Sequence, residues 1–291
     1  MTVSLQRDLD PQTKIWRYMA LDKFIHLLDS QSLYFSTLNE YSKSDPFEGI
    51  PPVRIIKAIR DIVPLGEGLK KAISDFESEL KAKILTDDEL RTSLNSLAEP
   101  LRSEHQSFIT FTTELFKGHV VNCWHANAYE SEAMWKLYGD SHRGVAIQTT
   151  VGKLQSALAS DEKIKICKVV YSDYHTPSNE ALRHLLMSEL GPVMKRASYS
   201  HEEEVRAYFL PAGFKVGLKP SNAKSCLVKL KNMSFMERVV VSPYTSEPYM
   251  SAVKAIAGKF QVECEVEESN LLRGVEGLFD LGVVNGLFKS E

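Results

Sequence analysis

The sequence predicts an α+β fold with a mixed, mostly antiparallel sheet core and a helical insertion. Short segments rich in aromatic and β-branched residues recur along the chain, as expected for half-buried strands. Residues 52–106 differ, because Lys, Glu and Asp alternate there with apolar residues at helical spacing. No Pro-, Gly- or Ser-rich linker divides the 291 residues, so we expect a single domain over 1–291 that contains the 52–106 insertion.

The first elements follow from the composition near the N-terminus. Residues 15–19 hold Ile, Trp, Tyr and Met and predict a strand. Apolar residues at helical spacing over 24–28 predict a helix, which Asp22 can cap. Residues 32–36 have the composition of a second strand, and the Ser, Asp, Pro and Gly of 39–49 predict a loop.

Strand and helix signals alternate after the insertion. Alternating apolar and polar residues predict a strand at 108–112. Helices are expected at 130–138, at the start of 151–215, at 180–190 and at 249–258. The further expected strands are 119–124, 144–148, 164–171, 203–210, 226–230, 238–241 and 260–265.

Composition excludes several classes of protein. The chain has 35 Lys+Arg against 38 Asp+Glu, a formal net charge of −3, so no general basic field favours nucleic acid. The N-terminal residues lack the apolar core of a signal peptide, and no apolar run is long enough for a membrane span. The four cysteines lie far apart without a CxxC pair, so we expect neither a disulfide framework nor a structural zinc site, and no metal ligands are assigned. These features predict a cytoplasmic protein with reduced thiols and no membrane contact.

Paired carboxylates are the first candidate site. Glu202 and Glu204 lie two residues apart where a strand is predicted, so their side chains would share one face. Such a pair could stabilise a developing positive charge and bind a substrate hydroxyl. The alternative is a structural charge ladder, in which both glutamates and Arg206 pair with Arg17 or Lys195.

The segment DPFEG at 45–49 is the second candidate. Asp45 and Glu48 could bind a cation or a substrate hydroxyl, whereas an Asx-type turn with Phe47 as a hydrophobic plug is the structural alternative. Cys123 and His125 would share a strand face, but nothing marks an activated thiol, so a buried structural cysteine is favoured.

The order of the motifs resembles a widespread bacterial family of unknown function. That family has a YRY or YKY strand, then NDPFE, MWxxYxxxxxGV, and ExExR preceded by Lys. Lys195 and Arg196 stand where the family has its Lys, and the resemblance extends over about residues 14–265. The motifs that carry it here are WRYM (16–19), LYFS (33–36), DPFEG (45–49), CW (123–124), ESEAMWKLY (130–138), GVAIQ (144–148) and HEEEVRAYF (201–209).

A weaker resemblance is to the ADP-ribosyltransferase superfamily. Arg17 and Tyr18 fall on a first strand, 34–37 (YFST) on a second, and Glu202-x-Glu204 opens a late strand. The chain departs from that pattern because it lacks a Ser-Thr-Ser triplet and has a long spacing before the ExE motif. The resemblance implies an ADP-ribosyltransferase-like fold, with NAD as a substrate.

The same resemblance implies roles for individual residues. Glu204 and Glu202 would be catalytic, the arginine would bind the pyrophosphate or the adjoining ribose, and an aromatic ring would stack on the nicotinamide. In the MWKLY segment, Met134 and Tyr138 are expected to face the core, while Trp135 lines a cleft. The residues that would bind NAD are Arg17, Tyr18, Tyr34, Ser36 and Trp135.

Three functions remain open at this point. The first, which we favour, is an NAD-consuming transferase or glycohydrolase, such as a bacterial toxin or antiphage effector, with a protein or nucleic-acid acceptor. The second is a metal-dependent nuclease that would use the carboxylates of both candidate sites together with Lys195. The third is a non-enzymatic recognition module, in which the 52–106 insertion docks a protein partner.

Overall fold

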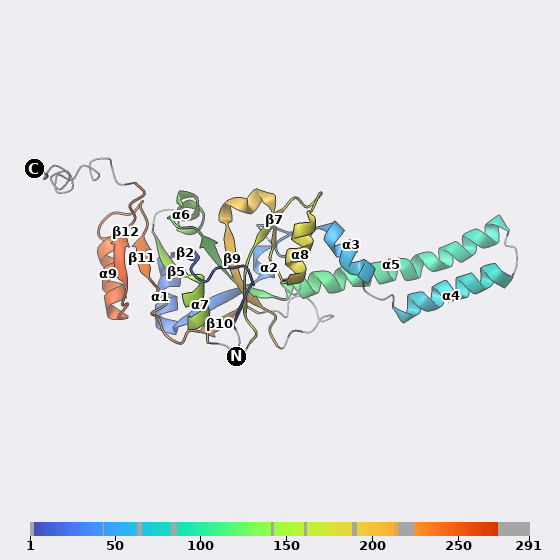
Figure 1. The fold of residues 1–291 in the computed structure, drawn as a ribbon, viewed down its shortest axis with the longest axis horizontal. Helices are drawn as coiled ribbons and strands as arrows, with labels where there is room; N and C mark the ends of the chain where they lie inside the picture. The colour runs from blue at the N-terminus through green and yellow to red at the C-terminus, as the bar shows by residue number, and fades with distance from the viewer. Residues whose placement is uncertain are drawn as a thin grey trace, which may run out of the picture.

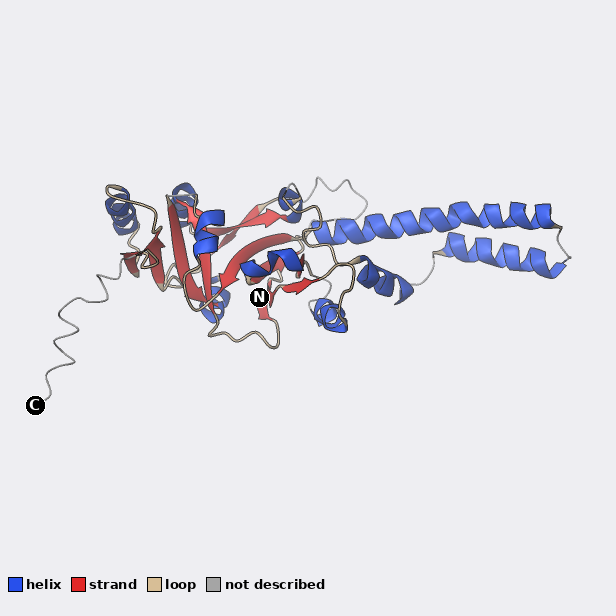
Figure 2. Ribbon diagram, turned by 90° about the horizontal axis from the view of Figure 1, so that it is seen from above, coloured by secondary structure: helices blue, strands red, loops and turns tan. Residues whose placement is uncertain are grey.

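A large sheet and a projecting pair of helices form the chain (Figures 1 and 2). The computed structural model describes residues 3–42, 44–62, 66–82, 86–140, 143–159, 162–187, 191–212, 214 and 224–272. Within these ranges, ten strands form one sheet in the order β1-β6-β9-β4-β2-β5-β11-β12, with β3 beside β4 and β10 beside β3. Strands β7 and β8 form a separate parallel pair.

The bounds of the elements are as follows. The strands are β1 Ser4–Leu5, β2 Lys14–Ala20, β3 Ser32–Thr37, β4 Val120–Ala126, β5 Gly144–Thr150, β6 Lys165–Lys168, β7 Val170–Ser172, β8 Met194–Arg196, β9 Glu204–Phe209, β10 Cys226–Lys229, β11 Arg238–Val241 and β12 Glu265–Glu268. The helices are α1 Leu21–Ser30, α2 Leu38–Tyr41, α3 Val53–Ile62, α4 Glu67–Ala82, α5 Asp87–Lys117, α6 Glu132–Tyr138, α7 Val151–Ala157, α8 Asn179–Met187, α9 Tyr249–Lys259 and the 3₁₀ helix η1 Ala197–Glu202.

The predicted fold class is confirmed. Most neighbouring strands of the large sheet are antiparallel, and the pairs β1–β6 and β11–β12 are parallel. Strand β5 is buried along its whole length because helices cover both faces of the sheet. Val145 and Ile147 face the core that α1, α7 and α9 complete, while Ala146 faces the opposite side, under α6.

Strands β2 and β4 part in the middle of the sheet. β2 pairs with β5 from Lys14 to Ala20, but it pairs with β4 only at Ile15 and Trp16. Beyond that point β3 takes the edge of β4, opposite Val121 and Val120. The parting leaves a space between β2 and the β3–β4 pair.

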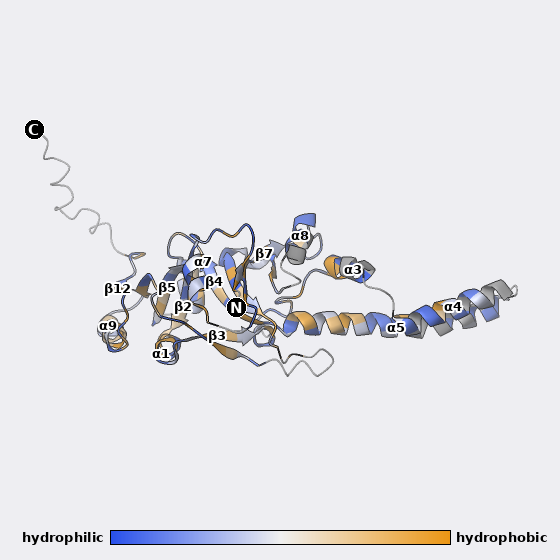
Figure 3. Cartoon of the chain, turned by 60° about the horizontal axis from the view of Figure 1, so that its bottom comes forward, coloured by the Kyte–Doolittle hydropathy of each residue, from blue (hydrophilic) through white to orange (hydrophobic). Residues whose placement is uncertain are grey.

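Helices α3, α4 and α5 occupy most of 52–106 and carry the chain away from the sheet (Figures 1 and 2). The end of α5 nearest the sheet is the more hydrophobic end (Figure 3), and Phe116 is buried there. No helix in the described part of the chain is long and apolar enough to cross a membrane.

The strand predicted at 108–112 is wrong, because these residues belong to α5. Thr86 and Glu89 form a capping box at the start of this helix, and it continues to Lys117. Phe108 and Phe116 both pack in one hydrophobic cluster, and the Thr112 hydroxyl donates to the Phe108 carbonyl, as a helix allows. The alternation of Phe, Ile and Thr therefore reflects a partly buried helix end.

Smaller differences occur at the ends of elements. The strand expected at 260–265 lies at β12 instead, because α9 continues to Lys259 and Gln261 then takes a left-handed conformation with φ 54°. The predicted loop at 39–49 begins with the last three residues of the short helix α2. Asp22 lies in the first turn of α1, whose N-cap is Ala20.

His119, between α5 and β4, is expected to make the stability of the fold pH-dependent. Burial lowers the pKa of this imidazole from 6.5 to about 4, while its Nδ1 lies 2.9 Å from the Leu115 carbonyl oxygen. As the pH falls below 6.5, the unfolded chain therefore takes up a proton before the folded chain does. The free energy of unfolding should fall by about 3 kcal/mol between pH 7 and pH 4 through this residue alone.

Denaturant unfolding of the wild type and His119→Gln at pH 7 and pH 4 checks this prediction. The wild type should lose more stability than the variant as the pH is lowered. Equal losses in the two proteins would show that His119 does not cause the acid sensitivity.

Candidate active site

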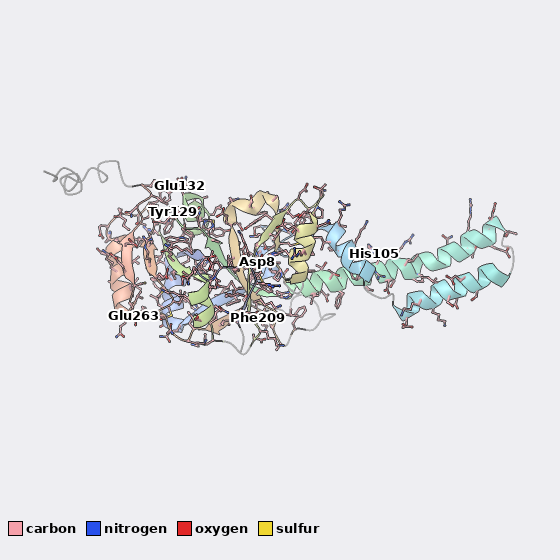
Figure 4. The ribbon with its side chains drawn as sticks, viewed as in Figure 1. Asp8, His105, Tyr129, Glu132, Phe209 and Glu263 are labelled. Carbon is pink, nitrogen blue, oxygen red and sulfur yellow. The ribbon has the colours of Figure 1, made fainter. Side chains whose placement is uncertain are left out.

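A cavity of about 1180 Å³ lies where β2 and β4 part. Its walls come from β2, α1, β3, α2 and the segment after it, β4, α6, β8, η1 and β9. In Figure 4, Tyr129 and Glu132 mark the start of α6, which forms one wall, whereas His105 lies out along α5. The cavity is thus a feature of the sheet and not of the projecting helices.

Five buried ionic side chains meet at one wall of this cavity. Lys195 Nζ donates to Glu202 and to Glu204 Oε2, the latter at 3.0 Å, and lies 3.4 Å from Glu48 Oε2. Arg206 donates from Nε to Glu204 Oε1 at 2.6 Å and from Nη2 to Glu48 Oε1 at 2.7 Å. Each of these side chains is less than a tenth exposed. We call Glu48, Lys195, Glu202, Glu204 and Arg206 the charged cluster.

Two different local structures supply the two predicted glutamates. Glu204 and Arg206 lie on β9 and share a face, as the alternation of a strand requires. Glu202 does not lie on the strand, because it ends η1, and Glu203 then takes a left-handed conformation with φ 40°. The prediction that both glutamates lie on one strand is therefore wrong, although both side chains reach Lys195.

The DPFEG segment reaches the charged cluster through Glu48. Asp45 Oδ1 accepts from Arg196 Nη2 at 2.7 Å and from the Phe47 backbone N–H at 3.0 Å, which is an Asx-type turn. The Phe47 side chain is 48% exposed, so it is not a hydrophobic plug. The Arg196 guanidinium lies over the rings of Phe47 and Tyr199, at 5.3 and 5.4 Å.

The charges in the cluster stabilise one another. Burial alone would raise the pKa of Glu204, but Arg206 and Lys195 outweigh it and hold that pKa well below its usual range. Burial alone would lower the pKa of Lys195, but Glu204, Glu48 and Glu202 outweigh it and raise that pKa. Three carboxylates face two cations, so the cluster formally carries one excess negative charge.

The two central glutamates differ in how fully their oxygens are occupied. Both oxygens of Glu204 accept from Arg206, and Oε2 also accepts from Lys195. Glu202 accepts from Lys195 at one oxygen and from the Tyr138 hydroxyl, at 2.8 Å, at the other. Glu202 is therefore the carboxylate with more capacity to accept hydrogen bonds from a ligand.

Arg17 introduces positive charge elsewhere in the cavity. It lies on β2 one residue past the last pair with β4, and its Nη1 donates to the Cys123 carbonyl at 3.4 Å. No carboxylate in the described part of the chain lies within ion-pair distance of it, and burial lowers its pKa. The Tyr41 side chain interacts electrostatically with both Arg17 and Glu204. Exposed Lys23 and His26 of α1 also line the cavity.

Aromatic side chains form much of the remaining wall. Tyr18, Tyr34 and Ser36, which were predicted to bind NAD, all line the cavity. Trp135 does not, because it is buried behind Tyr18 at a ring-centroid distance of 4.9 Å and donates to Glu130 at 3.1 Å. In its place, Met134 and Tyr138 of the same helix line the cavity. Met134 is also buried in a hydrophobic cluster, as predicted, whereas Tyr138 is 45% exposed, contrary to the prediction that it faces the core.

Cys123 and His125 lie on the cavity side of β4. Burial and the neighbouring Glu204 carboxylate raise the pKa of the Cys123 thiol above its usual range, so this cysteine is not an activated nucleophile. His125 is held by the backbone, with Nδ1 2.7 Å from the Glu202 carbonyl oxygen.

Several residues of this site were missed in the sequence. Tyr138, Tyr41 and Tyr171 surround the two glutamates, and the Tyr171 hydroxyl accepts from the Glu204 backbone N–H at 2.9 Å. Burial raises the pKa of each of these phenols, so they remain protonated hydrogen-bond donors at neutral pH. Among the residues that the structure describes, no group of three His, Cys, Asp or Glu side chains has the geometry of a metal site.

Part of the chain is similar to a known protein family. The profile of a family described as a protein of unknown function (DUF2971) matches residues 134–207, which include Lys195, Glu202, Glu204 and Arg206. The resemblance to a family of unknown function is thus supported for this segment, and the N-terminal motifs lie outside it. A comparison with curated proteins finds no match.

Among solved structures, the chain is similar to Thermus sp. 2.9 DarT in complex with NAD+. The sequence identity is 10% and the TM-score 0.33, with 90% of this chain and 97% of that chain covered.

Proposed function

We propose that the chain binds NAD+ in the cavity and cleaves the bond between nicotinamide and ribose, as a glycohydrolase or an ADP-ribosyltransferase. The observation that carries this proposal is the pair of opposite charges within one cavity. The charged cluster has one excess negative charge, and Arg17 is a cation without a carboxylate partner among the described residues. NAD+ has a complementary pattern, with a cationic ring on one ribose and an anionic pyrophosphate beyond it.

The reaction assigns a task to each part of the site. The bond between ribose C1′ and the nicotinamide nitrogen breaks, the electron pair leaves with nicotinamide, and the ribose becomes an oxocarbenium ion. Water or an acceptor nucleophile then bonds to C1′ and loses a proton to the surrounding water. The excess negative charge near this carbon stabilises the cation, as preorganised charge does in other enzymes.

Within this proposal, Glu202 accepts a hydrogen bond from a ribose hydroxyl, because its oxygens are the less occupied. Glu204 is a positioning residue that holds Lys195 and Arg206, and Lys195 in turn holds Glu202. Arg17 binds the pyrophosphate, for which its planar guanidinium is suited. Tyr34 and Tyr18 offer aromatic surface for the nicotinamide ring.

One observation supports the nuclease alternative, and another opposes it. It requires the DPFEG segment to reach the ExE motif, and Glu48 does share Arg206 and Lys195 with Glu204. However, those cations occupy the carboxylate oxygens that Mg²⁺ would need. We therefore favour cleavage of NAD+, with a protein or nucleic-acid acceptor and with α3–α5 as the surface for a protein partner.

Replacement of Arg17 tests the proposed binding mode. Arg17→Met should weaken NAD+ binding by about 10- to 100-fold, because a charge-assisted hydrogen bond to the pyrophosphate is lost. Lys14→Met is the matched control, since Lys14 lies on the same strand, is exposed and does not line the cavity. Titration calorimetry with NAD+ in the presence of EDTA measures both affinities. Equal affinities in the two variants would contradict the assignment of Arg17.

A further inference from the structure

His125 occupies the last residue pair before β2 and β4 separate. It lies opposite Trp16 on β2 and opposite Glu204 on β9. The residue is 3% exposed and lines the cavity, with the Tyr18 ring 6.3 Å away between centroids. The imidazole therefore lies in the cavity wall beside the charged cluster.

The two ring nitrogens of His125 have different surroundings. Nδ1 lies 2.7 Å from the Glu202 carbonyl oxygen, and a carbonyl only accepts, so Nδ1 carries a hydrogen. In the neutral ring Nε2 then has a free lone pair. Nε2 is buried and has no hydrogen-bond partner among the described residues. A buried polar atom without a partner is costly, and such atoms are uncommon in folded proteins.

We infer that His125 Nε2 accepts a hydrogen bond from the nicotinamide–ribose end of the bound dinucleotide, an inference that rests on the proposed function. That end is favoured because His125 holds the backbone of Glu202 and lies across from Glu204. Two groups there can donate: the carboxamide N–H of nicotinamide and a ribose O–H. Either would give His125 a role in ligand recognition in addition to its bond to Glu202.

A hydrogen bond from the carboxamide to His125 Nε2 would make the site selective for NAD+ over its acid analogue. Nicotinic acid adenine dinucleotide carries a carboxylate in place of the carboxamide, so it has no N–H to give to Nε2. Its carboxylate would also approach a cluster that already has one excess negative charge. The site would then bind NAD+ in preference to this acid analogue.

Two substitutions test the roles of the two ring nitrogens of His125 independently. The amide of asparagine falls near the position of Nδ1, so His125→Asn keeps a donor to the Glu202 carbonyl and removes the acceptor. The longer glutamine places its amide near Nε2, so His125→Gln keeps an acceptor there and removes the donor. The fluorescence of Trp16 and Trp124, which line the cavity, reports binding in a rapid-mixing experiment read before turnover.

The expected result is that His125→Asn weakens NAD+ binding by about tenfold, whereas His125→Gln stays within about threefold of the wild type. Loss of the preference for NAD+ over the acid analogue in His125→Asn identifies the carboxamide as the donor. Equal weakening for both dinucleotides identifies the ribose hydroxyl.

The opposite pattern would overturn the inference. Unchanged NAD+ affinity in His125→Asn, with loss in His125→Gln, would mean that His125 only supports the Glu202 backbone. Absence of NAD+ binding to the wild-type chain would overturn the proposed function together with this inference. NAD+ binding by the wild-type chain thus distinguishes failure of this inference from failure of the proposed function.

Discussion

Glu202→Gln is expected to reduce nicotinamide release from NAD+ by about 10²- to 10³-fold, because it removes the charge that stabilises the oxocarbenium ion. Glutamine has the same shape, and Lys195 keeps Glu204 and Glu48 as partners, so the folded structure should persist. NAD+ affinity should change by only a few-fold, since the missing interaction is strongest in the transition state. Chromatographic measurement of nicotinamide and titration with NAD+ check the two expectations.

The neighbouring glutamates provide controls for this prediction. Glu203→Gln makes the same chemical change at an exposed residue outside the cavity lining, and it should leave release unchanged. Glu204→Gln should lower both release and thermal stability, because both oxygens of Glu204 hold buried cations. Equal activity of the Glu202 and Glu203 variants would refute the role of Glu202.

Arg206→Met should lower the free energy of unfolding by about 3–5 kcal/mol, because it removes the main cation from two buried carboxylates. Arg206 is 1% exposed and bonds to both Glu204 and Glu48. Arg196→Met is the matched control, since Arg196 is 35% exposed at its side chain and pairs with Asp45 alone among carboxylates in the described chain. It should cost less than Arg206→Met, because a single carboxylate, Asp45, loses its cation and keeps the Phe47 backbone N–H as a donor.

Denaturant unfolding of the two variants at neutral pH gives this comparison. If both lost the same small amount, the charged cluster would not be a major source of stability.

The directions of the pKa shifts determine the pH range over which the charged cluster stabilises the fold. The contribution of Glu204 is present above the ordinary glutamate pKa of about 4.3 and is lost as the pH falls below it. That of Lys195 is present below about pH 10.4 and is lost as the pH rises above it.

Local signals in the sequence predicted much of the sheet. The expected strand at 238–241 coincides with β11, and those at 15–19 and 32–36 fall within β2 and β3. Residues 108–112 show where such signals fail. Their alternating pattern resembles a strand, but a capping box at Thr86 and contacts with a distant cluster make them helical. The tertiary contact that decides between the two is not visible in a short segment.

In the candidate site, too, some features were predictable from the sequence and others were not. The charge-ladder alternative placed Glu202 and Glu204 with Arg17 or Lys195, and the structure brings Lys195 to both glutamates. The left-handed Glu203 that moves Glu202 off the strand was not predictable from composition, because any such residue can adopt an extended conformation. Tyr138 was assigned to the core because Met134 is its neighbour one turn away, yet its hydroxyl bonds to Glu202. Which face of a short helix meets a cavity depends on how β2 and β4 separate.

Nicotinamide release from NAD+ tests the central claim most directly. The wild-type chain is incubated with NAD+ in EDTA, with and without cell extract as a source of acceptor, and nicotinamide is quantified by chromatography. We expect release by the wild type and loss of that release in Glu202→Gln. No release from the wild type in either condition would contradict the account, and metal-dependent nuclease activity and binding partners would then be tested.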